Sequence, residues 1–510
     1  MITKNFIRSN TYYDSVTLMM ISSKLSAIDG VENAAVMMGS EYNKQLMSDS
    51  GLLLEEHMNA TPNDMIIGVV AANDEAAAAV QKAVEEALEE KNNQSAAGDI
   101  KSKTLEGASR RLQGANFAVV SLPGRYAARE VDKALDHDLN VLLFSDNISV
   151  EDEIRLKDKA IGKGLLMMGP DCGTAIINGV SLGFANKVNR GNIGIVAASG
   201  TGLQEVSVIV HKAGFGISHA IGTGGRDLKP EVGGRMMLVG LEALSEDQDT
   251  DVIVIVTKPP GVEVMKKILL KASMISKPII GCFLGGDPQL LEESNVVYAK
   301  TLEDAGVMAV QVARGEIPRS EWDQDRKQKL EDIATQEKLK YDNQQKYIRG
   351  LYSGGTLTYE AMLLGKDMLG TINTNIKMDG TTFLINVEKS YGHTFLDMGD
   401  DYFTDGRPHP MIDPRLRLQR MESEIDDPEV AVISFDILLG YGSHEDPAGA
   451  LLPAIRKAKL KERPITFIAT ICGTDGDSQG LETQKAKLED LGVIVMNSNA
   501  EASRLALMLV

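Results

Sequence analysis

The stretches that decide the fold of this chain are GNIGIVAASGTGLQEVSVIV (residues 191–210) and KYIRGLYSGGTLTYEAMLL (residues 346–364). In each, an apolar run rich in β-branched residues leads into a glycine turn and then into a helix-type pattern. A polar loop, another helix and further apolar strands follow both stretches in the same order. This repeated order predicts parallel sheets covered by helices, so we expect two related doubly wound α/β units.

Outward from these stretches, the alternation of strands and helices predicts five segments. Residues 1–98 have the pattern of a small α+β domain, with a helix over Ser15–Ile28 and a linker over Lys91–Gly98. The other expected segments are a Rossmann-like domain over 99–190, a doubly wound domain over 191–315, a charged linker helix over 316–345 and a second doubly wound domain over 346–510.

Composition excludes several classes of protein. A formal net charge of −19 makes nucleic acid an unfavourable partner, and the longest apolar runs have the length of strands, so we expect no membrane span. Cys172, Cys282 and Cys472 lie far apart and form no CxxC pair, which is typical of a reducing compartment. We therefore expect a soluble cytoplasmic protein.

The two glycine turns are the main candidates for ligand binding. Each opens a helix, where free backbone N–H groups and the helix dipole favour a bound anion. An ordinary helix cap is the alternative interpretation. The residues that we expect to bind phosphate are Ser199, Gly200, Thr201, Gly202, Ser353, Gly354, Gly355 and Thr356.

A second polar cluster follows each turn. Gly224, Gly225 and Arg226 lie in GTGGRD (222–227), which can offer backbone amides and a guanidinium to an oxyanion. Its counterpart is HTFLDMGDDYFTDGRPHPMIDPR (393–415), where three prolines exclude a regular helix and predict a loop. A solvated acidic loop is the alternative for this stretch. Its candidate site residues are His393, Asp400, Arg407 and His409.

Two further polar residues follow buried strands. His444, in GYGSHEDP (440–447), stands at the carboxyl end of a strand, where open α/β sheets bind ligands, and can act as an acid or base. The spacing of the histidines matches no compact ligand motif, so we predict no metal. Cys172, in the turn GPDCG (169–173), is expected to be structural.

Several of these stretches resemble a known family. FAVVSLPGRYAAREVDKAL, GPDCGTAIING and GNIGIVAASGTGLQE resemble the succinyl-CoA synthetase α-subunit, and the second half is similar to a further ligase domain of that superfamily. The whole arrangement, with NTYYDSV, HTFLDMGDD, GRPHPMIDP and GSHEDPAGA, resembles the FdrA family. The resemblance implies a CoA-binding-type Rossmann domain over 99–190 and two flavodoxin-like ligase domains over 191–315 and 346–510.

The sequence also departs from the synthetases. NVVYAKTLEDAG (295–306) lacks the histidine that carries the phosphoryl group in that family, and the chain has no counterpart of the ATP-grasp domain. The glycine fingerprint that binds CoA is missing as well. We therefore predict no bound cofactor, and CoA would require a pocket around Ser121–Arg125 and Ser145–Asn147.

A phosphate site without that histidine suits a substrate that is already an acyl phosphate. The FdrA resemblance implies a subunit of oxamate carbamoyltransferase, which exchanges carbamoyl phosphate and oxamate for oxalurate and phosphate in allantoin breakdown. The implied partners are these small molecules, companion subunits and further copies of the chain. An acyl-CoA synthetase and a non-catalytic scaffold or regulatory subunit are the alternatives.

Roles for individual residues follow from this hypothesis. Glu205 matches the glutamate that orients the phosphohistidine in the synthetases, and Glu360 is its counterpart in the second half. We expect Arg407 or Arg226 to hold the acceptor's carboxylate, and His409 or His444 to polarise the carbamoyl carbonyl. Predicted for catalysis are His409, His444, Arg407, Glu205 and Glu360, and for substrate binding Gly224, Gly225, Arg226, His393 and Asp400.

Overall fold

The structure is a computed structural model of the 510-residue chain. It describes residues 1–510 except 12, 14–16, 19–20, 23–24, 26–27, 97–101, 103, 292–293, 343, 405–406 and 462. Contacts divide the chain into two compact units, Met1–Ala108 and Ser109–Val510. The helix expected over Ser15–Ile28 and the end of the linker expected over Lys91–Gly98 lie partly outside the described residues. No helix among the described residues is both long and apolar enough to cross a membrane.

The first unit is built on a small antiparallel sheet with strand order β1-β3-β2. Residues on one face of β3 pack against α3, while Ile66 points to the other face and packs near Met47 of α2. The linker prediction was wrong for residues 91–96, because α3 continues to Ala96 through a run without glycine or proline. The elements are β1 (Ile2–Arg8), β2 (Val31–Met38), α2 (Glu41–Asp49), η1 (Glu55–His57), β3 (Met65–Ala71) and α3 (Asp74–Ala96).

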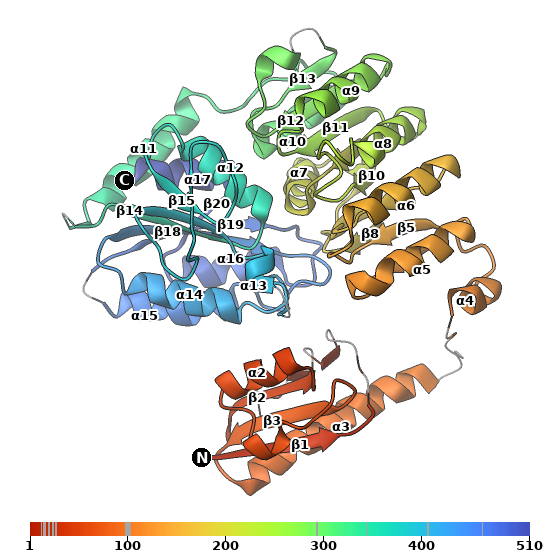
Figure 1. The fold of residues 1–510 in the computed structure, drawn as a ribbon. Coiled ribbons are helices and arrows are strands. Elements are labelled where there is room, and N and C mark those ends of the chain that lie inside the picture. Colours follow the sequence, from red (N-terminus) through yellow and green to blue (C-terminus); the bar gives the residue numbers. More distant parts are fainter. Residues whose placement is uncertain are drawn as a thin grey trace. The chain divides into compact units, whose positions relative to one another are not determined.

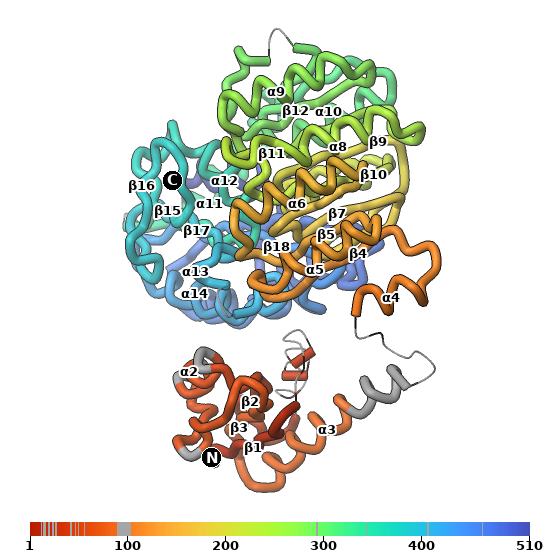
Figure 2. The backbone as a smooth tube through the Cα atoms, turned by 45° about the vertical axis from the view of Figure 1, so that its right-hand side comes forward, coloured from red at the N-terminus to blue at the C-terminus, as the bar shows by residue number. Residues whose placement is uncertain are grey.

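The second unit begins with a three-stranded parallel sheet of order β4-β5-β6. Its helices α5 and α6 pack against each other, and α6 also contacts α8 of the next sheet, as Figure 2 shows. The elements are α4 (Leu105–Arg111), β4 (Phe117–Val120), α5 (Gly124–Asp136), β5 (Asn140–Leu143), α6 (Val150–Gly162) and β6 (Met167–Met168).

The next sheet has the order β13-β12-β11-β9-β10-β7-β8. The strands from β13 to β10 are parallel, and β7 pairs antiparallel with β10, so the sheet starts before residue 191. The elements are β7 (Thr174–Ile177), β8 (Val180–Gly183), β9 (Arg190–Ala197), α7 (Gly200–Lys212), β10 (Ile217–Gly222), α8 (Arg235–Glu246), β11 (Val252–Thr257), α9 (Val262–Ser273), β12 (Ile279–Phe283), η2 (Pro288–Leu291), β13 (Val296–Tyr298) and α10 (Leu302–Ala313).

A third sheet, all parallel, repeats this arrangement. Its order is β16-β15-β17-β14-β18-β19-β20. Strands β17, β14, β18, β19 and β20 take the same relative positions as β10, β9, β11, β12 and β13 of the preceding seven-stranded sheet. That order confirms the predicted pair of flavodoxin-like units. The elements are α11 (Gln324–Lys338), β14 (Tyr347–Tyr352), α12 (Gly355–Gly365), β15 (Ile372–Thr374), β16 (Thr382–Phe383), β17 (His393–Asp397), α13 (Asp401–Thr404), α14 (Arg415–Ile425), β18 (Val430–Leu438), η3 (Gly449–Leu451), α15 (Leu452–Lys459), β19 (Thr466–Cys472), α16 (Leu481–Glu489), β20 (Ile494–Met496) and α17 (Asn499–Met508).

Four helices form a shared layer between the two large sheets (Figure 1). Helices α7 and α10 of the first half pack on α12 and α17 of the second, and one apolar cluster joins them to the inner faces of both sheets. On the sides away from this layer, α8 and α9 cover the sheet of β7–β13, and α14 and α15 cover the sheet of β14–β20. The two halves therefore fold around a common core.

Two buried glutamates hold the shared layer together by capping helices of the opposite half. Glu205 on α7 accepts a hydrogen bond from Asn499 N at the start of α17, at 2.9 Å. Glu360 on α12 accepts one from Leu302 N at the start of α10, at 2.7 Å. The Asn499 side chain donates to the second carboxyl oxygen of Glu360 at 2.7 Å. Each carboxyl group satisfies an N–H that the helix itself leaves unpaired.

We expect Glu360 to make the folded state less stable as the pH rises. Burial raises the pKa of Glu360 to about 7, above its value of about 4.3 in an unfolded chain. The folded state thus binds the proton more tightly. Its contribution to stability is complete below about pH 4 and is lost as the pH rises through 7. Glu360→Gln should reduce the change in unfolding free energy between pH 5 and pH 8. The change that Glu360 contributes is roughly 1.4 kcal/mol for each unit by which its pKa in the folded state exceeds that in the unfolded state.

Denaturant unfolding at pH 5 and pH 8 measures this effect. Glu482→Gln, which changes an exposed glutamate of α16, is the matched control and should keep the wild-type dependence. If the unfolding free energy depends on pH equally in the wild type and in Glu360→Gln, the folded state does not hold a proton on Glu360.

Candidate functional site

The two glycine turns meet at the carboxyl ends of the central strands β9 and β14. The hydroxyl groups of Ser199 and Thr356 are 2.6 Å apart, so the turns share a hydrogen bond. A Cβ atom added to Gly354 would lie 2.8 Å from the side chain of Thr201, which shows how closely the turns are packed. Both turns therefore belong to one site.

The first turn leaves backbone amides for a ligand. Ser199 caps α7 by accepting a hydrogen bond from Gly202 N at 2.9 Å, as the helix-cap interpretation predicts. The N–H groups of Gly200 and Thr201, in the first helical turn, have no acceptor within the helix. A Cβ on Gly200 would lie 3.3 Å from the hydroxyl of Thr174, so there is little room for a side chain at the start of α7. These amides, with the helix dipole, favour an anion.

The second turn already holds a carboxylate of the protein itself. The backbone amides of Ser353 and Gly354 each donate to Asp436 at 2.9 Å, and the Ser353 hydroxyl does so at the same distance. Arg417 also binds Asp436 at 2.9 Å, and both side chains are buried. The expectation that Ser353 and Gly354 bind phosphate was wrong for these two amides, because both donate to Asp436. Asp436 binds the amides that precede α12, not those of Gly355 and Thr356, which open the helix as Gly200 and Thr201 open α7.

A second carboxyl group, Asp397, lies against the same turn. One of its oxygens would be 2.3 Å from a Cβ on Gly355, and the other accepts from Gly399 N at 2.9 Å. Burial raises the pKa of Asp397 to about 7, although nearby Lys258 opposes the shift. Asp397 can therefore exchange a proton near neutral pH, as a general acid or base requires.

Lys258, from the first of the two seven-stranded sheets, lies close to residues of the second. It follows β11, and burial lowers the pKa of its amine while the charges of Asp397, Asp400 and Asp171 oppose that shift. Its ammonium group lies over the ring of Tyr359, 5.4 Å from the ring centre. Asp400, a predicted substrate-binding residue, thus lies close enough to act on Lys258.

The turn after β6 faces the turn after β10. A Cβ on Gly224 would come within 2.3 Å of Pro170 O, and one on Gly225 would lie 3.6 Å from an Asp171 oxygen. Asp171 keeps contact with solvent, yet partial burial, followed by the charges of Asp146 and Asp401, raises its pKa to about 6. The glycines thus permit close packing of two turns beside the site.

Arg226 makes its contacts with residues of the preceding domain. Its guanidinium donates to Ile148 O at 2.7 Å and pairs with the buried Glu153 at 3.0 Å. Next to it, Asp227 and Lys157 form a buried ion pair at 2.8 Å. The geometry assigns Arg226 to the contact with α6, in contrast to its predicted role in holding a carboxylate.

His409 and His444 lie on two joined loops. Met411 N donates to His409 Nδ1 at 3.2 Å, and His444 N donates to Met411 O at 2.7 Å. Burial lowers the pKa of His409 to about 4, so its ring is neutral at pH 7. Because Nδ1 accepts a hydrogen bond, the proton lies on Nε2, which would be 2.5 Å from a Cβ on Gly399. His409 therefore offers an N–H donor near Asp397.

The remaining predicted residues have other surroundings or contacts. His393 begins β17 whereas Asp397 ends it, so His393 stands at the opposite edge of the sheet, where its ring packs on Tyr347. Arg407 is exposed, and its charge acts on Tyr402. Glu205 and Glu360 use their carboxyl oxygens to cap helices, in contrast to the catalytic role predicted for them.

Cys172 is structural, as expected. Its thiol is buried against Gly222, and burial raises its pKa to about 12, so no thiolate forms near neutral pH.

The segments that would flank CoA contact each other. Leu122 N donates to Ser145 Oγ at 2.9 Å, and a Cβ on Gly124 would lie 2.4 Å from the carbonyl oxygen of Asn147. Arg125, the cation of this region, stacks on Tyr126 at 4.8 Å. The segments around Ser121–Arg125 and Ser145–Asn147 are therefore packed against each other.

Sequence reasoning missed Lys258, Asp436 and Arg417. Asp436 is a charged residue within the apolar strand β18, which is a detectable anomaly in the sequence. Lys258 directly follows an apolar strand, which is also a recognisable position. Arg417 lies on α14, and only the fold shows that it reaches Asp436.

Comparison with known families agrees with this architecture. Residues 351–509 match the profile of the CoA-ligase family, and residues 1–104 match that of the AllF, heavy metal-associated domain. The chain is 30% identical over 179 residues to the succinate–CoA ligase [ADP-forming] subunit alpha of Staphylococcus epidermidis, covering 34% of this chain and 57% of that protein. These matches show that residues 351–509 are similar to the CoA-ligase family and that about a third of the chain is similar to the succinyl-CoA synthetase α-subunit.

A relative of equal length defines the family. YahF of Escherichia coli K12, an uncharacterized protein, is 43% identical over 512 residues, which cover 99% of this chain and 98% of YahF. The chain therefore belongs to the family of YahF, within the CoA-ligase proteins that carry an AllF-type N-terminal domain. Among solved structures, acetyl-coenzyme A synthetase 1 of Ca. Korarchaeum cryptofilum shares 15% identity, with a TM-score of 0.35 over 81% of this chain and 87% of that one.

The AllF-type domain of this chain lacks the usual ligands of heavy metals. Residues 1–104 contain no cysteine and one histidine, His57. Soft metal ions are held in proteins mainly by thiolates. The residues of this unit therefore supply no thiolate to a heavy-metal ion.

We expect anion binding at the first turn to weaken as the pH rises. Asp397 and Asp171 are neutral below their raised pKa values of about 7 and 6 and negative above them. Sulfate keeps its charge over this range, so its affinity should fall roughly tenfold between pH 5.5 and pH 8 by repulsion alone. Asp397→Asn should remove most of this fall. Calorimetric titration with sulfate measures it.

Asp426→Asn is the matched control for this titration, because Asp426 is exposed at the far end of α14. It should leave the dependence on pH unchanged. A sulfate affinity that rises with pH, or that falls equally in Asp397→Asn, would contradict the assignment.

Proposed function

We propose that the chain is a subunit of oxamate carbamoyltransferase, in which the first glycine turn holds the phosphate of carbamoyl phosphate. The observation that carries the proposal is the pairing of the two turns: the amides of Gly200 and Thr201 at the start of α7 have no acceptor within the helix, and the turn that they contact lies against Asp397, a carboxyl group able to exchange a proton near neutral pH. Resemblance to the FdrA family and the AllF-type domain, which points to allantoin and oxamate metabolism, support it.

The site supplies a group for each part of the transfer. The oxamate nitrogen attacks the carbamoyl carbon and forms the new C–N bond, while the C–O bond to phosphate breaks. Asp397 takes the proton from the attacking nitrogen and passes it to the departing phosphate, so that oxalurate and hydrogen phosphate are formed. The neutral His409 donates a hydrogen bond to the carbonyl oxygen as negative charge develops on it. The α7 amides stabilise the leaving phosphate.

An acid–CoA ligase is the second candidate, because the chain belongs to the CoA-ligase family. Two observations weigh against it. Residues 295–306 contain no histidine to carry a phosphoryl group, and the segments expected to flank CoA are packed together. A non-catalytic subunit would leave Asp397 and Lys258 without a role, although companion subunits are part of the proposal.

Replacing the proposed base should abolish the transfer. In the complex of the full chain with its companion subunits, Asp397→Asn should lower kcat for oxamate-dependent phosphate release by about 10²- to 10⁴-fold. His409→Phe keeps the ring that packs near Phe184 but removes the donor, and should lower kcat by about 10²-fold. A phosphate assay with carbamoyl phosphate and oxamate measures both.

His393→Phe is the control for the second variant, because it preserves the ring contact with Tyr347 at the other edge of the sheet. Its kcat should stay within a few-fold of the wild type. Phosphate release that never depends on oxamate, or that depends on added CoA instead, would reject the proposed function.

A further inference from the structure

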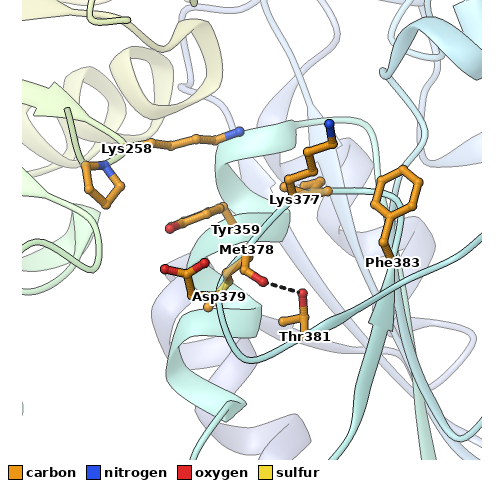
Figure 3. Close-up of a pocket in the computed structure, with 9 residues that line it drawn as sticks. Lys258, Tyr359, Lys377, Met378, Asp379, Thr381 and Phe383 are labelled. Atoms are coloured by element: carbon orange, nitrogen blue, oxygen red, sulfur yellow. Dashed lines mark hydrogen bonds between the residues drawn. The ribbon is translucent and has the colours of Figure 1, made fainter. Parts of the chain in front are cut away.

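A cavity of about 550 Å³ lies beside the paired turns, between the two halves of the second unit. Figure 3 shows Lys258 entering from the loop after β11 toward Lys377 on the loop after β15, with Tyr359 of α12 below Lys258. The lining residues are Lys258, Pro259, Tyr359, Ile376, Lys377, Met378, Asp379, Thr381 and Phe383.

The cavity is continuous with the glycine turns. Tyr359 stands one helical turn after Gly355, the residue against which Asp397 lies, so the cavity begins about 5–6 Å from the start of α12. Lys258 lies over Tyr359 at 5.4 Å and is also within electrostatic reach of Asp397 and Asp400. A ligand that contacts Lys258 in the cavity therefore sits next to the proposed base.

The lining suits a small carboxylate. Lys258 and Lys377 contribute two ammonium groups, whereas Asp379 contributes one carboxylate, so the wall has an excess of positive charge in a strongly acidic protein. The remaining lining includes Tyr359, Met378 and Phe383, whose apolar surfaces can pack on a planar group. Arg226, the cation of the neighbouring turn, is already paired with Glu153 and cannot take this role.

We propose that this cavity binds the acceptor of the transfer, a small carboxylate that carries an amide or amino nitrogen. This inference rests on the proposed function. Lys377 and Lys258 hold the carboxylate, and Tyr359 and Met378 support the planar part. The nitrogen then points toward Asp397 and the phosphate site. No bond is made or broken in the cavity itself, because its residues only position the acceptor.

Lys377→Met tests the assignment, because Lys377 is exposed, lines only the cavity and lies outside the proposed acid–base chemistry. Oxamate binding is measured by calorimetry on the full chain, alone and with its companion subunits. The variant should bind oxamate at least tenfold more weakly while keeping its sulfate affinity. In the transferase assay it should raise KM for oxamate by a similar factor, with kcat and KM for carbamoyl phosphate nearly unchanged.

Lys366→Met is the matched control, since Lys366 stands exposed at the other end of α12. It should bind oxamate as the wild type does. Wild-type oxamate affinity in Lys377→Met, or displacement of oxamate by ADP or CoA in competition, overturns the inference. If transfer occurs with an unchanged KM, the inference fails and the proposed function stands. If oxamate binding depends on Lys377 but no transfer occurs, the cavity is a carboxylate site, and the proposed function fails together with the acceptor role.

Discussion

The interaction on which the site depends is the one between Asp436 and the second glycine turn. Its carboxylate takes the amides of Ser353 and Gly354, and Arg417 neutralises it from α14. A buried carboxylate is stable only when its hydrogen bonds and its charge are satisfied, and here both conditions are met. The protein thus fixes the backbone that precedes α12 with its own side chain, while the amides of Gly200 and Thr201 that open α7 stay available to a ligand.

This difference arises on a symmetric framework. The two halves exchange caps, with Glu205 of α7 binding the start of α17 and Glu360 of α12 binding the start of α10. The exchange places the glycine turns in contact, where the hydroxyl groups of Ser199 and Thr356 share a hydrogen bond. The framework explains why two sequence repeats produce one site. The differences that matter for chemistry lie in the residues around it, namely Asp397, Asp436 and Lys258.

Much of the fold could be predicted from the sequence. Strands such as Val252–Thr257 are continuous β-branched runs. Their alternation with helices predicts parallel sheets, whatever the conformation of the connecting loops. The glycine turns were recognisable because the backbone alone creates the anion site. The roles of Glu205 and Glu360 were not, because a glutamate on an apolar helix face can serve a ligand or a cap. Only the position of Asn499, 294 residues beyond Glu205, decides between them. His393 was misplaced because residues 393–415 were expected to form a loop, whereas His393–Asp397 is strand β17 and holds His393 at the end away from Asp397. Arg226 was misplaced because its partner Glu153 lies in another domain.

The central claim is that the amides of Gly200 and Thr201 bind the phosphate. A crystal structure with a phosphonate analogue of carbamoyl phosphate tests it most directly. The account predicts the phosphonate at the amides of Gly200 and Thr201, with Asp436 still bound to Ser353 and Gly354. A phosphonate at the start of α12, on the amides of Gly355 and Thr356 or in place of Asp436, would contradict it.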